Sequence, residues 1–555
     1  MHKPKPALFS SRRLLLFLQQ IAVYSPVLIA ILIMLPRLLS PQFGLFDDGK
    51  SMITAQQISR GDWSFQFDTP DGRFRPVYWL SFALVYLLFG LRPFWFFLVN
   101  ALVLAGTAAC LVQLVLNLGK GRWQAWLTGM LFVLACPVIE NYYTLSKGEP
   151  WQLFFLALSL LVASRYRSTA SRWAKVGRIG LIAVMILLAN LAKETSVLVA
   201  GIALVWYLAD RLVSRKQPGR SKGGPYGAYL AAGLISAVVF LLMRSGLVSG
   251  ALQTQGYTNH YIFTLGQIQA SLVRWSGWLV RDFAYLAPLV LGTVVLWVVR
   301  KKLPQAMLMF QALVWAAVWV AVFLPWYFMA EYYMLPAAFG LAVFSGTLLT
   351  VLAEAWKAER AWVKWFTGLA LGIFALLFIL VLLNGICSAR IQLAVDAANA
   401  ETLRTLAEVA PQDSTVLVNI QVANEYIDEI AMQLPVYFGR SDLVVKAFRS
   451  PELALSGTYY IMAPQVSHQP LLTDRMGVVE ATQNDWNASL QAYIESHPGV
   501  QVMATVGKQF RLFIIDLPRL LCPLIKTRSF CAMPSPLVDL RPFTYGWTVY
   551  TLIIP

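Results

Sequence analysis

Apolar runs of about twenty residues recur along the chain, and short polar segments separate them. A run of this length can cross the hydrocarbon core of a membrane as a helix. We predict roughly eleven such spans, near residues 14–36, 94–117, 124–143, 151–164, 177–192, 196–213, 226–247, 284–299, 306–326, 334–354 and 364–387. The run from Val77 to Gly90 is apolar but shorter, so we expect a helix that lies at the membrane surface.

Lys and Arg gather in the short segments between these runs. The clusters are Lys3, Lys5, Arg12 and Arg13; Lys120 and Arg122; Arg165, Arg167, Arg172, Lys175 and Arg178; Arg211, Arg215, Lys216, Arg220 and Lys222; Arg300 to Lys302; and Lys357, Arg360 and Lys364. Basic loops favour the cytoplasmic side. The pattern therefore predicts a cytoplasmic N-terminus and, with an odd number of spans, a C-terminus outside. It also explains the net charge of +17 without a nucleic-acid partner.

After residue 388 the pattern changes to that of a small α/β domain. "STVLVNI", "GTYYIMAP", "KQFRLFIIDL" and "WTVYTLII" predict strands, and "NEYIDEIAMQL" predicts an amphipathic helix. We therefore divide the chain into a membrane domain, residues 1–387, and a periplasmic or extracellular domain, residues 388–555. The membrane domain has a long outer loop at 38–92. The outer domain holds no evident cluster of acids or His, so we expect it to shape the acceptor side without supplying a catalytic group.

Composition agrees with a polytopic α-helical membrane protein. Hydrophobic residues make up 58% of the chain and charged residues 13%, and the mean hydropathy is +0.60. Among the five cysteines, Cys110 and Cys136 fall in or near spans, where we expect packing roles. Cys522 and Cys531 lie in the outer domain, where an oxidising compartment would allow a disulfide; two free thiols are the alternative.

Charged residues near the predicted outer face are few and come from separate segments. They are Asp47, Asp48, Arg73, Arg75, Glu140, Lys147, Glu149, Lys193, Glu194, Arg274, Arg281, Asp282 and Glu331. Charge beside hydrocarbon is costly and usually marks a functional site. Acids and bases from several segments at one depth therefore indicate a shared polar cavity.

Four stretches in this part of the chain resemble motifs of membrane glycosyltransferases of the GT-C class. "FDDGKSMITAQQISRGDW" followed by "FRPVYWLSFALVYLLFGLRPFWFFLVNALV" is similar to their start, with an acidic pair after the first span. "CPVIENYYTLSKGEPWQLFFL", "LLANLAKETSVLV" and "EYYMLPAAFG" are similar to three later motifs, in order. The resemblance covers roughly residues 14–350 and points to the lipid A aminoarabinose transferases, the protein O-mannosyltransferases and bacterial relatives.

The resemblance implies transfer of a sugar from a polyprenyl phosphate to an acceptor hydroxyl at the outer face of the membrane, with inversion. An acceptor hydroxyl needs a positioned general base, and the resemblance gives this role to Asp47. Asp48 would orient Asp47 or hold a divalent metal, Mg²⁺ or Mn²⁺, together with Glu140. The alternative is that Asp47 and Asp48 only cap the helix that follows.

The resemblance also implies a site for the donor phosphate. Arg75 stands before Pro76 where many relatives have Lys-Pro, and Arg offers two hydrogen bonds to a phosphate; an interfacial anchor is the alternative. Lys193 and Glu194 would extend this site, or form a structural ion pair. Glu140 and Lys147 belong to the second motif and would bind the donor, although a solvated loop acid also explains Glu140.

Two other classes of function fit parts of the pattern. A transporter or flippase for a lipid-linked sugar would have a similar polar cavity, but it does not explain the long first loop with its acidic pair, and no repeat symmetry is evident. A non-catalytic assembly protein of the cell envelope is the third hypothesis. In all three, the chain resides in the plasma or inner membrane, and in the first its partners are a polyprenyl-phosphate sugar and an envelope glycan, lipid or protein acceptor.

Overall fold

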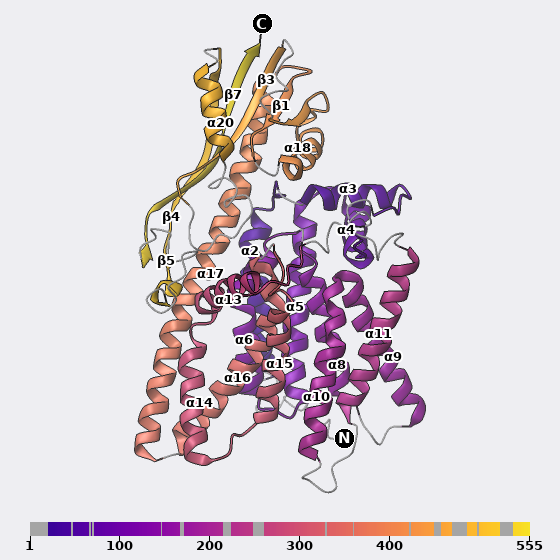
Figure 1. Cartoon of the computed structure of the whole chain (residues 1–555), viewed down its shortest axis with the longest axis vertical. Coiled ribbons are helices and arrows are strands. Elements are labelled where there is room, and N and C mark those ends of the chain that lie inside the picture. Colours follow the sequence, from indigo (N-terminus) through magenta and orange to yellow (C-terminus); the bar gives the residue numbers. More distant parts are fainter. Residues whose placement is uncertain are drawn as a thin grey trace, which may run out of the picture.

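The structure is a computed structural model in which a bundle of apolar helices carries a smaller domain built on a sheet (Figure 1). It describes residues 20–45, 48–65, 68, 72–145, 147–166, 171–214, 224–247, 260–327, 330–358, 360–420, 423–448, 457–468, 485–496, 499–521 and 537–554. The bundle contains α2 (Ser25–Leu39), α3 (Asp48–Ser59), α4 (Pro76–Phe89), α5 (Pro93–Asn117), α6 (Arg122–Val133), α7 (Cys136–Tyr142), α8 (Glu149–Ser164), α9 (Arg172–Ala192), α10 (Val199–Ser214), α11 (Pro225–Leu247), α13 (Leu265–Phe283), α14 (Leu286–Arg300), α15 (Ala306–Ala321), α16 (Leu335–Ala358) and α17 (Ala361–Val409).

Six helices among the described residues are long and apolar enough to cross a membrane, or up to eight if each bent pair counts as one span. The bent pairs are α6 with α7, at 56°, and α13 with α14, at 86°. The predicted total of eleven spans is therefore not confirmed. Three further predicted spans correspond to shorter apolar helices, α2, α8 and α15, and α4 is a fourth helix of this kind. The chain is a multi-pass α-helical membrane protein.

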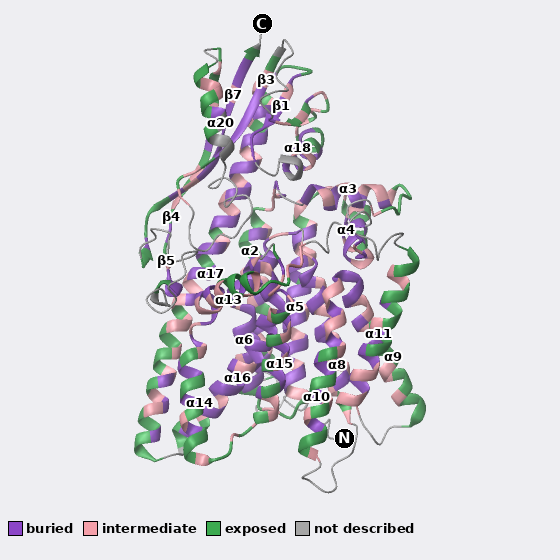
Figure 2. Ribbon diagram, in the orientation of Figure 1, coloured by how far each residue is buried: buried purple, intermediate pink, exposed green. Residues whose placement is uncertain are grey.

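Large apolar side chains cover the outer surface of several bundle helices. Figure 2 shows exposed residues along α9, α10, α11, α14 and the lower part of α17. Exposed side chains on these helices include Leu181, Leu208, Leu234, Leu242, Leu291, Trp297 and Leu376. Apolar patches of this extent on helices mark contact with lipid, which agrees with the spans assigned to these segments.

Proline and glycine set the boundaries of the helices near the candidate site. Pro76 and Pro93 stand at the first positions of α4 and α5, where a missing N–H costs nothing. Gly90 ends α4 with a positive φ of 66°, a conformation that glycine adopts readily. The chain therefore turns sharply between α4 and α5, and the predicted short apolar helix ends where the sequence places Gly90.

The smaller domain contains a five-stranded sheet in the order β2-β1-β3-β7-β4. Its strands are β1 (Thr415–Val418), β2 (Val444–Ala447), β3 (Gly457–Val466), β4 (Gln501–Arg511) and β7 (Pro542–Ile554), and β5 (Ile514–Ile515) pairs with β6 (Val538–Asp539) in a second sheet. β1 is parallel to β2 and β3, whereas β7 is antiparallel to β3 and β4. The helices of this domain are α18 (Ala423–Phe438) and α20 (Asp485–Ser496). The amphipathic helix and three of the predicted strands are present, whereas the stretch 508–517 is divided between the end of β4, β5 and the start of a 3₁₀ turn; β2 and β6 are additional strands. Cys522 and Cys531 lie outside the described residues.

Helix α17 joins the two parts without interruption, from Ala361 to Val409. Its first half is apolar and largely exposed, as a lipid-facing span would be. In its second half, Ile391, Val395 and Ala398 are buried at helical spacing against the small domain. The change of composition at residue 388 therefore falls inside a helix, and a division of the chain at this residue stays a prediction.

Candidate functional site

The predicted acidic pair lies where the chain leaves α2 and enters α3. Asp48 is the first residue of α3, and Asp47 lies outside the described residues. The Asp48 side chain is buried, and it accepts a hydrogen bond of 2.8 Å from the backbone N–H of Gly44. Asp48 therefore ties α3 to the segment before it. We call residues 44–49 the acidic loop.

A buried ion pair lies close to the acidic loop. Arg37 near the end of α2 contacts Asp396 of α17 at 2.6 Å, and both side chains are 1% exposed. The same guanidinium donates to the carbonyl of Gln42 and covers the ring of Phe97 at 4.0 Å. Gln392, one turn before Asp396, donates to its carboxylate. The sequence analysis did not single out Arg37 or Asp396, because nothing in the local pattern links two residues so far apart.

Asp48 lies in an environment that favours its protonated form. Burial raises the pKa of Asp48 to about 6, and the neighbouring negative charge of Asp396 adds to the effect. The Gly44 hydrogen bond and the charges of Arg37 and Lys147 oppose it. Asp48 is thus close in space to an acid from α17 and to a lysine from the loop before α8.

Arg75 is held by an acid that the sequence analysis did not identify. Its guanidinium donates three hydrogen bonds to Asp68, the shortest at 2.6 Å, and Trp79 donates to the same carboxylate at 2.7 Å. Burial alone would raise the pKa of Asp68, but Arg75 and Arg73 together lower it below its usual value. Asp68 lies in a loop, where no helical or strand spacing indicates its partner. A role for Arg75 in donor binding stays a proposal.

Lys193 and Glu194 have separate partners. The Lys193 ammonium forms an ion pair of 2.8 Å with Glu149, the first residue of α8. Glu194 begins the 3₁₀ turn η2 (Glu194–Leu198) and accepts a hydrogen bond of 2.9 Å from the Phe74 N–H. Thus Lys193 is tied to α8, and Glu194 supports the segment that carries Arg75.

Two lysines face the same pair of tyrosine rings. Lys147 lies 4.1 Å from the ring centre of Tyr332, and Lys193 lies 5.2 Å from that of Tyr333. Lys193 is buried, whereas Lys147 is half-exposed. Among the described residues, no carboxylate lies within ion-pair distance of the Lys147 ammonium. We call Lys147 and Lys193 the lysine pair; an aromatic wall of this kind holds cations through the ring quadrupole.

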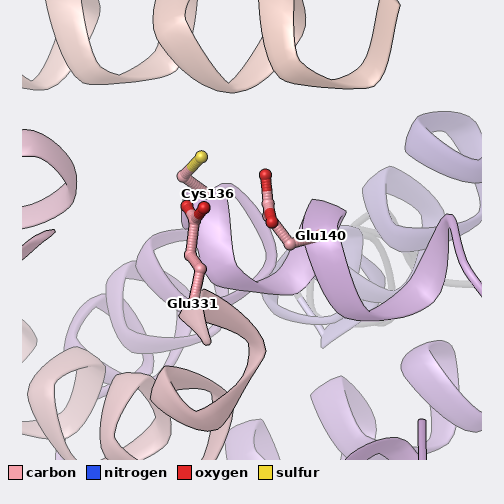
Figure 3. A group of neighbouring side chains, drawn as sticks. All are labelled: Cys136, Glu140 and Glu331. Atoms are coloured by element: carbon pink, nitrogen blue, oxygen red, sulfur yellow. The ribbon is translucent and has the colours of Figure 1, made fainter. Parts of the chain in front are cut away.

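A second group of polar side chains gathers on α7 and on the 3₁₀ turn η3 (Glu331–Met334). Figure 3 shows Cys136, Glu140 and Glu331 pointing into one space, and one ligand atom of each lies within 4.8 Å of the others. Arg281 contacts Glu331 and also binds Asp282 through two hydrogen bonds. Ser388 of α17 donates to Glu140 at 2.7 Å. We call Cys136, Glu140 and Glu331 the acid–thiol cluster.

The acid–thiol cluster is the place where the described residues could hold a metal. Its three ligand types, a thiol and two carboxylates, fit Zn²⁺ better than Mg²⁺, which prefers oxygen ligands alone. Asp48 does not belong to this group, so the two acids predicted to share a metal, Asp48 and Glu140, stand in different environments. The positive charge of Arg281 already balances part of the negative charge.

The lysine pair and the acid–thiol cluster are adjacent. η3 supplies Glu331 to the acid–thiol cluster, and it also supplies Tyr332 and Tyr333, whose rings the lysine pair faces. Asn141 of α7 donates to the Tyr332 carbonyl at 3.1 Å. Lys147 in turn acts on the charge of Asp48. Acids and cations that are scattered in the sequence are therefore linked in space through η3 and Lys147. A separate hollow of about 510 Å³ lies near the C-terminal ends of α5 and α16, and none of these residues lines it.

No protein-family model matches the chain, and no curated protein matches it. Several solved structures are similar to it. ArnT from Cupriavidus metallidurans bound to undecaprenyl phosphate gives a TM-score of 0.47, with 15% identity over 79% of this chain and 92% of that chain. The Archaeoglobus fulgidus oligosaccharyltransferase tethered to an acceptor peptide gives 0.42, with 14% identity over 77% of this chain and 61% of that chain.

ArnT is one of the lipid A aminoarabinose transferases that the four motifs resemble. Identities and scores this low describe a likeness of fold and carry no inference about activity. A function has to be argued from the side chains of this chain.

Proposed function

We propose that the chain is a membrane glycosyltransferase that moves a sugar from a polyprenyl phosphate to an acceptor hydroxyl, with inversion, at the outer face of the membrane. The observation that carries this proposal is the proximity of Lys147, one of the lysine pair, to Asp48 of the acidic loop. A half-exposed lysine beside a buried carboxylate offers a cation for the donor phosphate next to acids that can receive a proton. A lipid-linked donor also requires the apolar helices that surround this region.

The proposed reaction places each charge near a matching side chain. The acceptor oxygen attacks the anomeric carbon, the bond from that carbon to the phosphate oxygen breaks, and the polyprenyl phosphate leaves with the bonding electrons. Asp47 accepts the proton of the acceptor hydroxyl. Asp48 is engaged by the Gly44 N–H and orients the loop, which leaves the adjacent Asp47 for this task.

The donor phosphate gains negative charge as it leaves. Lys147 is the first candidate to stabilise that charge, because it is half-exposed and rests on the Tyr332 ring. Lys193 adds positive charge from a buried position, with Glu149 holding it in place. Arg75 and Glu194 support the donor site indirectly, because each is already bound to another part of the protein: Arg75 to Asp68, and Glu194 to the Phe74 N–H.

A divalent metal, if the enzyme uses one, would be held by Glu140 together with Cys136 and Glu331. Such an ion would supply positive charge close to the lysine pair. The residues of the chain perform the remaining tasks: they bind the donor, orient the acidic loop and accept the proton.

The proposal includes the orientation of the chain in the membrane. With the N-terminus in the cytoplasm, the polar region and the small domain face the periplasm or the exterior of the plasma membrane, and the acceptor is an envelope glycan, lipid or protein. A reporter fused after Pro555 should then be exposed outside the cell, and a cytoplasmic reporter would contradict this orientation.

Release of free polyprenyl phosphate tests the activity itself. Purified protein in liposomes, incubated with a panel of polyprenyl-phosphate sugars and envelope extract, should release the lipid phosphate only when donor and acceptor are both present. A transporter would move the labelled donor across the bilayer without releasing lipid phosphate. An assembly protein would do neither.

A further inference from the structure

We propose that Glu429, from helix α18 of the small domain, is a positioning residue for the transferase site and holds the backbone of the acidic loop from above. This inference rests on the proposed function for its catalytic consequence. The contact itself stands on the geometry of α3 and α18.

Glu429 reaches the start of α3 directly. It is fully buried, and its carboxylate accepts a hydrogen bond from the backbone N–H of Gly49, the residue after Asp48. The approach is close: a Cβ atom at Gly49 would lie 2.6 Å from the Glu429 carboxylate and 2.8 Å from its Cα. Because Cα cannot move aside as a side-chain end can, this contact requires glycine at position 49.

A second residue of α18 binds the other end of the acidic loop. Gln433, one helical turn after Glu429, donates from Nε2 to the Gly44 carbonyl at 3.0 Å. Gly44 is also the residue whose N–H donates to Asp48. The two contacts from α18 therefore bracket the acidic loop, one at Gly44 and one at Gly49.

Apolar packing and a further hydrogen bond keep α18 in this position. Met432 of α18 joins a buried cluster with Met52 of α3 and Tyr78 of α4. Tyr437, near the end of α18, donates to the Leu91 carbonyl at 2.8 Å. The small domain is thus anchored at Gly44 and at Gly49, so that Asp48 is presented from a fixed backbone.

A carboxylate beside the first N–H groups of a helix is also favoured electrostatically. Its removal frees the Gly49 N–H and the start of α3, and small displacements of a catalytic group cost about a hundredfold in rate. Asp48 and Asp47 are the carboxylates nearest to Gly49 in the sequence. The expected consequence is a loss in the chemical step rather than in donor binding.

The experiment compares Glu429→Ala, Glu429→Gln and Gln433→Ala with the control Glu401→Gln, which removes an exposed ion pair to Lys508 in the same part of the chain. Glu429→Ala should lower kcat by about tenfold to a hundredfold with donor KM within twofold of wild type. Glu429→Gln should restore most of kcat, since the amide oxygen can accept from Gly49. Gln433→Ala should show a smaller loss of the same kind.

Hydrogen exchange separates this inference from the proposed activity. In Glu429→Ala, a peptide covering residues 44–52 should exchange faster than in wild type, and in Glu429→Gln and Glu401→Gln it should not. Unchanged exchange in Glu429→Ala, or a kcat equal to that of the control, would overturn the positioning role. If wild type itself shows no transferase turnover but Glu429→Ala still exchanges faster, the proposed function is refuted and the contact between Glu429 and Gly49 is supported.

Discussion

Arg37 and Asp396 form a buried ion pair of 2.6 Å although 359 positions separate them in the sequence. The pair joins the end of α2 to the part of α17 that packs on the small domain. It also places the charges of both residues beside Asp48. Breaking such a pair leaves an uncompensated charge on a buried side chain.

We expect Arg37→Met and Asp396→Leu each to destabilise the protein by about 3–5 kcal/mol. The double variant should recover much of this loss, because no unpaired charge remains. Thermal unfolding of the purified protein in detergent measures the effect, with the exposed pair Lys508–Glu401 as the matched control, where Glu401→Gln should cost at most about 1 kcal/mol. Additive losses in the double variant would show that the two side chains act independently.

The two aspartates of the acidic loop should differ in their effect on turnover. Asp47→Asn keeps the size of the side chain and removes the base, so we expect a folded protein that binds donor and loses about a hundred- to ten-thousand-fold in rate. Asp48→Asn should lose less, since its amide oxygen can still accept from Gly44. Donor binding and polyprenyl phosphate release are measured on both variants. Turnover of Asp47→Asn within about threefold of wild type would favour helix capping as the role of the pair.

Stability should depend on pH through Asp48. Burial raises its pKa from 3.8 to about 6 in the folded protein, so the folded state binds this proton more tightly than the unfolded state does. The resulting stability is fully present below about pH 4 and is lost as the pH rises through 6, by up to about 3 kcal/mol. Asp48→Asn cannot lose a proton. Its unfolding temperature should therefore exceed that of wild type at pH 8 and match it near pH 4, and an offset that is equal at both pH values would contradict the assignment.

The apolar pattern predicted most helices because lipid imposes a simple rule on composition and length. It predicted the short helix that ends at Gly90 and strands in the small domain. It also predicted that Asp48, Lys147, Lys193 and Glu331 lie at one depth near the outer face. These residues stand out locally, as charges at the ends of apolar runs. The count of spans was harder to predict, because the chain bends between α6 and α7 and between α13 and α14, and several apolar helices are short.

The partners of those residues could not be predicted in the same way. Asp396 lies in a stretch with ordinary helical periodicity, and Glu429 lies on an amphipathic helix of the small domain; neither has a local feature that points to the acidic loop. Their roles depend on which helices meet in space. The unbroken course of α17 past residue 388 is different, since Ile391, Val395 and Ala398 already followed helical spacing, and the change of composition concealed it.

Lys147 should contribute chiefly to donor binding and to the stabilisation of the leaving phosphate. Lys147→Gln removes the charge from a half-exposed position, so we expect kcat/KM for the donor to fall about tenfold to a hundredfold, as for loss of a charged hydrogen bond. Lys302→Gln, at an exposed lysine in the turn between α14 and α15, is the control and should change little. Steady-state kinetics with one donor checks both, and equal behaviour of the two variants would remove Lys147 from the site.

The acid–thiol cluster gives a prediction about metal content. If Glu140 holds a divalent ion with Cys136 and Glu331, the purified protein should contain about one Zn²⁺ per chain, and Cys136→Ser should lower this content severalfold. Elemental analysis after purification without added metal measures it. Absence of metal from wild type, with turnover unaffected by a chelator, would mean that Arg281 alone balances the cluster.

In the proposed reaction, the unbroken course of α17 would set the height at which an acceptor meets the membrane. A helix of 49 residues is about 74 Å long, and the hydrocarbon core accounts for about 30 Å of this. The remaining turns form a stiff support that carries the sheet at a constant distance above the lipid and leaves the small domain little freedom to tilt. If the proposed acceptor binds this domain, its length would decide whether it reacts. Its hydroxyl would have to extend over a fixed distance from the domain to the sugar at the bilayer surface.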